Sequence, residues 1–435
     1  MKKYDSYKDS GIEWIGEIPE HWEINNFQIL AKEEKYSFTG GPFGSDLKFN
    51  DYTEVGVRII QLQNIGDGLF NNEYKIFTSN DKADQLISCN IFPNEIIIAK
   101  MADPVARACF IPDFDSRFLM ASDGIRLAVN ENRFNSKFVL YGINSNYFRI
   151  QAEMNSSGST RLRIGLNTLK KLKFILPSLQ EQTTIANYLD HKTTQIDTLI
   201  AKKEQFISLL QEERTAVINQ AVTKGLDPNV KMKDSGIEWL GEIPEHWEVK
   251  KLAFEFNTLN TKRVPLSAEE RGKMESRIYD YYGASGVIDK VENYIFDEEL
   301  ILIGEDGANL LTRTKRLAFI ASGRYWVNNH AHIIKPINGN IYYFCELLEL
   351  IDYTIYISGS AQPKLTQEAL MSIKIPVPPI SEQNKIFDYL KDEFNKIDTI
   401  ISKSQQEIEL LKEYKTALIS EVVTGKVDVR DVILN

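Results

Sequence analysis

The sequence predicts an α+β protein made of two similar halves, in each of which a β-rich module is followed by one long helix. Two observations lead to this prediction. A 16-residue segment at 8–23, KDSGIEWIGEIPEHWE, returns at 233–248 with a single difference, Leu240 in place of Ile15. A second repeat, displaced by 201 residues, covers the stretches with helical periodicity. With 435 residues, the chain has room for two to four domains of ordinary size.

The two repeats divide each half into a nearly fixed head, a dissimilar middle and a similar tail. In the second repeat, Ser-Gly-Ser at 157–159 returns at 358–360, and Glu-Gln at 181–182 returns at 382–383. Such a chain duplicates a scaffold while two inserted modules differ. An enzyme with one active site has little need of this organisation, whereas a protein that recognises two different things at a set distance does.

The tails predict long helices. From about 178 to 223, apolar residues recur at intervals of three, four and seven, and the second copy keeps this pattern. Pro177 and a capping-box sequence at 178–181 mark the start, and Gly225 and Gly425 stand at the expected C-terminal caps. About 45 residues give a helix of roughly 67 Å, which needs a second long helix to cover its apolar stripe. Parallel and antiparallel pairing are both open, but a two-fold relation between the halves requires an antiparallel coiled coil, which we expect.

The middles, 24–156 and 249–357, predict mixed α+β modules. Short apolar runs alternate with turn signals such as 39–42, 66–68 and 304–307. The expected strands are 57–62, 95–99, 124–129, 299–303, 316–321 and 332–334, and the expected short helices are 134–147 and 342–350. We therefore predict module 1 at 1–176, a helix at 177–224, module 2 at 225–377, a helix at 378–424 and a tail at 425–435.

Charge gives a mixed indication of nucleic-acid binding. The net charge of −10 at pH 7 does not favour it, because a basic balance is the usual signature. Two tracts, however, each hold five basic residues and no acid, at 157–180 and 307–345. Side chains of the kinds found there reach phosphates and base edges, so DNA contact is the better prediction.

Several functions are disfavoured by missing or isolated motifs. The sequence has no Asn/Asp-Pro-Pro-aromatic tetrapeptide for adenine methylation and no Gly-x4-Gly-Lys-Ser/Thr phosphate loop. His330 and His332 lack the companions of a metal site, so a structural or DNA-facing pair is expected. Three well-separated cysteines predict reduced core thiols. Since no apolar run spans a membrane and no leader is apparent, we expect a cytoplasmic protein.

The two heads and the Pro-x3-Glu-Gln openings of the two long helices carry a family resemblance. Together with the segments at 41–45 (GPFGS), 61–65 (QLQNI), 282–286 (YGASG) and 328–332 (NNHAH), they resemble the specificity subunit of a type I restriction–modification enzyme. The resemblance extends over nearly the full length of the chain.

This resemblance implies two target recognition domains, each reading one half of a split double-stranded DNA sequence. The paired helices would act as a spacer and as the docking site for two methyltransferase subunits, which restriction subunits then join. It also implies that the chain is non-catalytic and holds no cofactor, because S-adenosylmethionine, ATP and Mg belong to the partner subunits. Two alternatives stay open: the specificity part of a related enzyme that cuts both sides of its site, and a non-DNA scaffold of two modules on a helical spacer.

Candidate DNA contacts come from the polar and basic residues of the modules, and no catalytic or metal-binding residue is expected. We assign phosphate contact to Arg161 and Arg163, whose second-copy counterparts are Gln362 and Lys364, because they belong to the repeated frame. We assign base contact to part of Asn328, Asn329 and His330. The full set is Ser45, Lys48, Gln63, Asn64, Lys100, Arg107, Arg126, Arg161, Arg163, Tyr282, Ser285, Arg313, Lys315, Arg316, Asn328, Asn329, His330 and Lys364.

Overall fold

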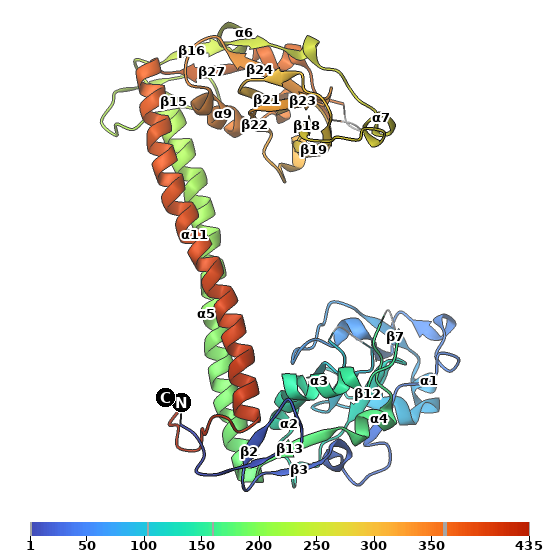
Figure 1. Cartoon of the computed structure of the whole chain (residues 1–435). Coiled ribbons are helices and arrows are strands. Elements are labelled where there is room, and N and C mark those ends of the chain that lie inside the picture. The colour runs from blue at the N-terminus through green and yellow to red at the C-terminus, as the bar shows by residue number, and fades with distance from the viewer. Residues whose placement is uncertain (1, 102–103, 159–160, 360–362, 435) are drawn as a thin grey trace. The chain divides into compact units, whose positions relative to one another are not determined.

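The computed structural model describes residues 2–101, 104–158, 161–359 and 363–434 (Figure 1). Gln362 and the last serine of each Ser-Gly-Ser repeat, Ser159 and Ser360, lie outside the described residues. The chain divides into two compact units, of which unit 1 is Met1–Lys203 with Gln406–Asn435 and unit 2 is Glu204–Gln405. Each unit therefore combines one module with part of both long helices.

Unit 1 contains two main sheets and a small head. One sheet has four antiparallel strands in the order β10-β9-β12-β4, and the other has five strands in the order β5-β7-β6-β11-β8. The strands are β1 (Tyr7–Asp9), β2 (Glu17–Pro19), β3 (Glu23–Asn26), β4 (Phe38–Gly40), β5 (Tyr52–Thr53), β6 (Val57–Ile60), β7 (Ile76–Thr78), β8 (Asn90–Ile91), β9 (Ile96–Ala99), β10 (Ala108–Phe110), β11 (Phe118–Met120), β12 (Gly124–Leu127) and β13 (Lys173–Leu176). The helices of module 1 are α1 (Asn80–Gln85), α2 (Ser136–Asn144), α3 (Asn146–Met154) and α4 (Leu166–Lys171). All four residues of β9 are buried, as expected of a central strand covered on both faces.

Unit 2 repeats the four-stranded sheet, in the order β22-β21-β24-β17, although the sequences of the middles differ. Its second sheet has the order β19-β18-β23-β20. The strands are β14 (Met232–Asp234), β15 (Glu242–Pro244), β16 (Glu248–Lys251), β17 (Phe256–Thr258), β18 (Tyr279–Gly283), β19 (Gly286–Val291), β20 (Phe296–Asp297), β21 (Leu300–Gly304), β22 (Ala318–Ala321), β23 (Arg324–Val327), β24 (Ala331–Pro336), β25 (Ile357–Ser358), β26 (Lys364–Leu365) and β27 (Lys374–Val377). The helices of module 2 are α6 (Leu252–Glu255), α7 (Ala268–Gly272), α8 (Asn309–Thr312), α9 (Ile341–Leu350) and α10 (Gln367–Ser372). The repeated sheet order shows a common core that the amino-acid sequences of the middles do not reveal.

The long helices are α5 (Leu179–Lys224) and α11 (Ile380–Val423), and they pack antiparallel (Figure 1). In unit 1, Asp197 pairs with Lys415 at 2.7 Å, and in unit 2 Asp398 pairs with Arg214 at the same distance. Residue numbers rise along one helix as they fall along the other, so the antiparallel coiled coil expected from a two-fold relation is confirmed. Apolar side chains of both helices join the core of each unit.

The Glu-Gln pair at the start of each long helix fastens the helix to its module. Glu181 accepts hydrogen bonds from His21 Nε2 (3.0 Å) and Trp22 Nε1 (3.1 Å) of the head. Gln182 accepts from the backbone N–H of Asn135 and donates to the carbonyl of Pro177, both at 2.9 Å. Unit 2 repeats this arrangement: Glu382 contacts His246 at 2.8 Å, Gln383 accepts from Asn340 N–H, and Gln383 donates to the carbonyl of Pro378.

The predicted capping box at 178–181 is only half formed. Ser178 Oγ accepts from the backbone N–H of Glu181 at 3.3 Å, as expected. The carboxylate of Glu181 turns to the head instead of returning to Ser178, so this half of the prediction is wrong. The physical reason is the buried indole N–H of Trp22, which needs an acceptor more than a solvent-accessible helix terminus does.

The glycines at the C-terminal ends of the long helices confirm the predicted caps. Gly225 and Gly425 have φ of +76° and +73°, a conformation that glycine adopts without strain. A Cβ on Gly425 would lie 2.3 Å from Pro19 and 3.2 Å from Trp22, so the end of α11 packs against the head of unit 1. Gly225 lies in the same way against Pro244 and Trp247.

The tail after Gly425 runs along the N-terminal segment, and the two chain ends meet in unit 1 (Figure 1). Asp428 N–H donates to the carbonyl of Lys2 at 2.9 Å, while its buried carboxylate accepts from Arg430 at 2.9 Å. Arg430 lies over the ring of Tyr4. We call this arrangement of Lys2, Tyr4, Asp428 and Arg430 the terminal clasp.

The cysteines are core residues, as predicted. Cys89, Cys109 and Cys345 are free and buried, and burial raises the pKa of Cys109 to about 12, so this thiol is un-ionised. Among the described helices, none is long and apolar enough to cross a bilayer.

The terminal clasp predicts an acid-sensitive contact between the chain ends. The hydrogen bonds from Arg430 hold the pKa of Asp428 below its ordinary value, although burial opposes them. Its stabilisation is therefore complete above the ordinary carboxyl pKa and is lost as the pH falls below about 4. We expect Asp428→Asn to lower the protection of residues 2–7 and 426–430 against amide hydrogen exchange at neutral pH, and acidification to lower the same protection factors in the unmodified chain, each measured against the intrinsic exchange rate at that pH.

Asp431→Asn is the matched control, because Asp431 also pairs with Lys2 but is 74% exposed and stabilises little. Unchanged exchange in the Asp428→Asn variant, or an equal effect in both variants, would contradict the role of the clasp.

Candidate nucleic-acid interface

In module 1, three charged side chains lie together beside the central strands β9 and β12. Lys100 follows β9 and Asp123 precedes β12, and Lys100 N–H donates to the carbonyl of Asp123 at 2.7 Å. The carbonyl of Lys100 accepts from Ile164 N–H at 2.9 Å, which brings the preceding residue, Arg163, to the same place. Arg163 donates to the carboxylate of Asp123. We call Lys100, Asp123 and Arg163 cluster 1.

Module 2 builds the same arrangement with different side chains. Glu305 follows β21 and His330 precedes β24, and Glu305 N–H donates to the carbonyl of His330 at 2.9 Å. The carbonyl of Glu305 accepts from Leu365 N–H at 2.8 Å, which places Lys364 beside them. We call Glu305, His330 and Lys364 cluster 2. The two clusters occupy equivalent backbone positions, so the modules present different chemistry at one shared location.

Cluster 1 has an inner and an outer cation. Lys100 is half-buried, its Nζ donates to the carbonyl of Ser122 at 2.9 Å, and burial together with nearby Arg163 lowers its pKa. Arg163 is 51% exposed, whereas its partner Asp123 is 19% exposed. The carboxylate thus lies inward and holds a guanidinium that reaches solvent.

Cluster 2 is organised around a buried acid. Glu305 pairs with Arg263 and, at 3.2 Å, with Lys364. Burial alone would raise the pKa of Glu305, but the hydrogen bond from Arg263 and the positive charges near it hold this pKa below its ordinary value. The adjacent acid, Asp306, holds His330 Nδ1 at 2.8 Å. Two neighbouring carboxylates therefore fix two exposed polar side chains.

His332 is a core residue rather than a DNA-facing one. Its Nε2 lies 2.7 Å from the carbonyl of Leu365, and its Nδ1 lies 2.9 Å from Asn260 Nδ2. Burial lowers its pKa, so the imidazole is neutral, with Nε2 donating and Nδ1 accepting. Among the described residues, no group of three or more His, Cys, Asp or Glu is arranged to hold a metal ion.

Four other candidates of module 1 are exposed on its surface and are not part of cluster 1. Lys48, Gln63 and Arg161 are exposed, and the Arg161 side chain forms no hydrogen bond or ion pair with the described residues. Ser45 lies in an exposed loop, where its hydroxyl contacts Asp46 at 3.1 Å. The loop leaves the sheet at Gly41, where a Cβ would fall 1.8 Å from the carbonyl oxygen of Ala121, so the start of the loop lies against the segment that leads to Asp123.

Three predicted contacts are instead occupied inside module 1. Asn64 is buried, its amide donates to the carbonyls of Asn71 and Tyr74, and its oxygen accepts from Gln61 N–H. Arg126 pairs with Glu95 at 2.6 Å. The half-buried Arg107 donates to the carbonyl of Leu62 at 3.0 Å. In this structure these side chains stabilise loops of the module, which a residue type alone does not indicate.

The second basic tract is not a positive surface. Its cations pair with acids from distant segments: Arg316 with Glu346, Arg324 with Asp297 and Lys335 with Glu298. Arg313 contacts Glu349 and donates to the carbonyl of Ile351. Within the described structure, Lys315 has no acidic partner. Counting charge along the sequence missed this neutralisation because the acids stand outside the tract.

The remaining candidates of module 2 lie near cluster 2 or in the second sheet. Asn328 is buried and its Oδ1 accepts from His330 N–H at 2.8 Å, so it orients the histidine backbone. Asn329 is exposed, and its carbonyl accepts from Arg263. Tyr282 stacks against Phe319, and Ser285 lies in the turn between β18 and β19.

Sequence reasoning missed Asp123, Arg263, Glu305 and Asp306. The sequence holds a signal for the last two, because 304–307 is a predicted turn directly after an apolar strand. It holds none for the pairing of Asp123 with Arg163, because these residues are 40 positions apart in the sequence.

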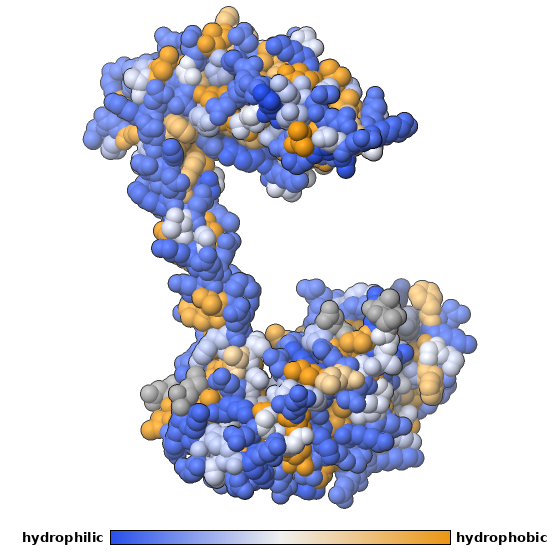
Figure 2. All heavy atoms as spheres, viewed as in Figure 1, coloured by the Kyte–Doolittle hydropathy of each residue, from blue (hydrophilic) through white to orange (hydrophobic). Residues whose placement is uncertain are grey.

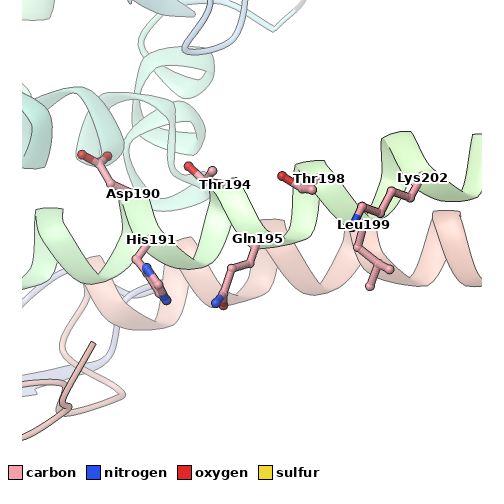
Figure 3. Close-up of a pocket in the computed structure, with 7 residues that line it drawn as sticks. All are labelled: Asp190, His191, Thr194, Gln195, Thr198, Leu199 and Lys202. Carbon is pink, nitrogen blue, oxygen red and sulfur yellow. The ribbon is translucent and has the colours of Figure 1, made fainter. Parts of the chain in front are cut away.

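A separate hollow of about 570 Å³ lies along α5 in unit 1, and Figure 3 shows the residues that line it. All of them belong to this helix: Asp190, His191, Thr194, Gln195, Thr198, Leu199 and Lys202. Because a single helix lines it, the hollow is a trough on the helix surface rather than an enclosed site. In Figure 2, small hydrophobic patches interrupt the mainly hydrophilic surface of the long helices.

Comparison with known proteins identifies one family. A family model described as the type I restriction modification DNA specificity domain matches residues 55–208 and 244–410. The putative type I restriction enzyme MjaX specificity subunit of Methanocaldococcus jannaschii is 25% identical to this chain and covers 96% of each sequence. A putative type I restriction enzyme specificity subunit of Haemophilus influenzae, S.HindORF215P, is 33% identical over 31% of this chain and 34% of its own length.

Two solved structures share the fold. A chain from a study of complex assembly and conformational transition of the type I R-M system aligns with a TM-score of 0.63 at 12% identity, covering 94% of this chain and 99% of its own length. The HsdS subunit from Thermoanaerobacter tengcongensis aligns with a TM-score of 0.54 at 12% identity, covering 94% and 98% of the two chains.

The exposed position of Arg161 predicts a sequence-independent contribution to DNA binding. We expect Arg161→Ala to weaken binding to every duplex tested and to reduce the slope of log Kd against log salt by about one, because one phosphate contact is lost. A salt titration followed by fluorescence anisotropy measures both quantities. Arg161→Lys is the control, since it keeps the charge and should keep the slope. An Arg161→Ala variant with unchanged affinity and slope would show that this side chain is only solvated.

Proposed function

The chain belongs to the type I restriction–modification DNA specificity family, and from this premise we propose that its two modules bind the two halves of a split DNA sequence. It is the specificity subunit of a type I restriction–modification enzyme. Its own task is recognition, and the chemical steps of modification and cleavage belong to other subunits.

The observation that carries this proposal is the pair of equivalent clusters. A duplicated frame places cluster 1 and cluster 2 at the same backbone position, but one presents Lys, Asp and Arg and the other Glu, His and Lys. A duplicated binding site for one shared ligand would keep its contacting side chains. Sites that differ in this way fit two unlike half-sites on double-stranded DNA.

The repeated frame also supports binding of two copies of one partner, a methyltransferase subunit. Three apolar positions of α5 recur 201 residues later on α11, and all six side chains are more than a third exposed. The pairs are Leu179 with Ile380, Leu199 with Ile400, and Leu209 with Leu410. Apolar side chains on an outer helix surface suit a protein partner. Restriction subunits join this core, and S-adenosylmethionine, ATP and Mg bind to the partner subunits, in the cytoplasm where the DNA lies.

A split, asymmetric target is the first expected outcome. Methylome sequencing of cells that carry this chain with its methyltransferase should reveal one motif with two unlike specified halves and an unspecified gap between them. Deleting the gene for this chain should abolish methylation at that motif. A continuous or palindromic motif would contradict two different readers, and methylation unaffected by the deletion would favour a scaffold unrelated to DNA.

Partner stoichiometry provides a second test. Leu199→Glu should remove one methyltransferase subunit from the assembly, and the double variant with Ile400→Glu should remove both, because a buried carboxylate at an apolar contact is costly. Native mass spectrometry of the purified complex counts the subunits.

Gln205→Glu is the matched control, since it adds a charge to an exposed position of α5 without removing an apolar side chain. Two bound methyltransferase subunits in the double variant would show that these positions do not form the contact.

A further inference from the structure

Both the backbone and the guanidinium of Arg163 are held by hydrogen bonds, which a contact with a phosphate does not require. Its backbone N–H donates to the carbonyl of Ser157 at 2.9 Å, and its carbonyl accepts from Ser157 N–H at 3.0 Å. It also bridges Met101 on the other side. The guanidinium is then held by Asp123. Main chain and side chain are therefore both restrained before any ligand binds.

Arg161, two residues earlier in the same segment, provides the contrast. It is exposed, and its side chain forms no hydrogen bond or ion pair with the described residues. A charged side chain without such restraints adapts to a phosphate at little cost, because phosphate contact needs charge rather than a set orientation. Reading a base edge needs a fixed fork, since arginine binds guanine O6 and N7 with two parallel hydrogen bonds.

We propose that Asp123 is a positioning residue that orients Arg163 to read a base edge in the half-site bound by module 1. This inference rests on the proposed function and reassigns Arg163, whose place in the repeated frame suggested phosphate contact. The bond to Asp123 engages one terminal nitrogen, Nη2, so Nε and Nη1 stay available as donors. Orientation by a carboxylate removes part of the side-chain entropy cost before DNA binds.

In cluster 2 carboxylates also hold exposed donors, but the residues differ. Asp306 holds Nδ1 of His330, whose side chain is 49% exposed, and Glu305 holds Lys364, which is 52% exposed. The acid follows the strand in module 2, whereas it precedes the next strand in module 1. Each module therefore pairs inward acids with outward donors at one shared position, and the identity of the donor distinguishes the half-sites.

The test uses the complex of the full chain with its methyltransferase, and competition binding with duplexes that carry single-base substitutions at every specified position. Asp123→Asn keeps the shape of the side chain but weakens its hold on Arg163. We expect about a tenfold loss of discrimination at one base pair of the first half-site, with an unchanged salt slope and an unchanged second half-site. Arg163→Lys should show the same loss, because it keeps the charge without the fork.

Asp84→Asn is the matched control, since Asp84 of α1 also pairs with an arginine of module 1, Arg117, but is 64% exposed, and Arg117 precedes β11 of the five-stranded sheet rather than a strand of the sheet that carries cluster 1. It should change no base preference. Asp306→Asn should reduce discrimination at one position of the second half-site alone.

Two results would overturn the inference. A uniform loss of affinity with a smaller salt slope in Asp123→Asn would make Arg163 a phosphate contact. A lower melting temperature with every base preference intact would make Asp123 purely structural. If the unmodified complex itself prefers no sequence, the proposed function fails; if it discriminates and Asp123→Asn discriminates equally well, this inference alone fails.

Discussion

The structure depends on the carboxylate and amide at the start of each long helix. Glu181 is 5% exposed and accepts a hydrogen bond from the indole N–H of Trp22, a fully buried side chain. Gln182 links the backbone at Asn135 to the backbone at Pro177. Hydrogen bonds to a charged acceptor contribute about 1.5–3 kcal/mol each, so the head stays attached to the helix that follows its module. Unit 2 uses the same pair with one bond fewer, because the buried Nε1 of Trp247 lacks a partner among the described atoms. The strands and helices between a head and its long helix therefore begin and end at segments that are hydrogen-bonded to each other.

This arrangement explains how the middles diverge while their core sheet persists. The backbone ladder at the strand ends uses N–H and carbonyl groups alone, so it tolerates any residue except proline at positions such as 100 and 305. Apolar strands β9 and β21 supply the burial, and the polar residues after them are free to vary. The buried strands thus stabilise each module, and the polar residues that follow them belong to the contacts that we propose for recognition.

Much of the frame could be predicted from the sequence, and the recognition surface could not. The nearly identical heads, the periodic tails and the glycines Gly225 and Gly425 are local signals, and the tails and glycines have their predicted structures. Asn64 and Arg126 have partners inside module 1, which the sequence does not indicate, because a polar residue type does not show whether a loop closes over it. Charge counting failed for Arg316 and Arg324 because their acidic partners come from other segments. Cluster 1 joins positions 100, 123 and 163, whose proximity follows only from strand pairing.

The terminal clasp has a topological consequence. In unit 2, residues 225–232 connect the end of α5 to the following head through the peptide chain, and in unit 1 the tail after Gly425 makes the corresponding junction with the N-terminal segment through non-covalent contacts. The order of the elements is therefore circular. The junction in unit 2 is a continuous peptide segment, and the junction in unit 1 is non-covalent. A circularly permuted chain, with its ends between residues 225 and 232 and its present ends joined, would have the same elements and contacts in a different sequence order. Where such a polypeptide begins is therefore a property of its gene more than of its fold.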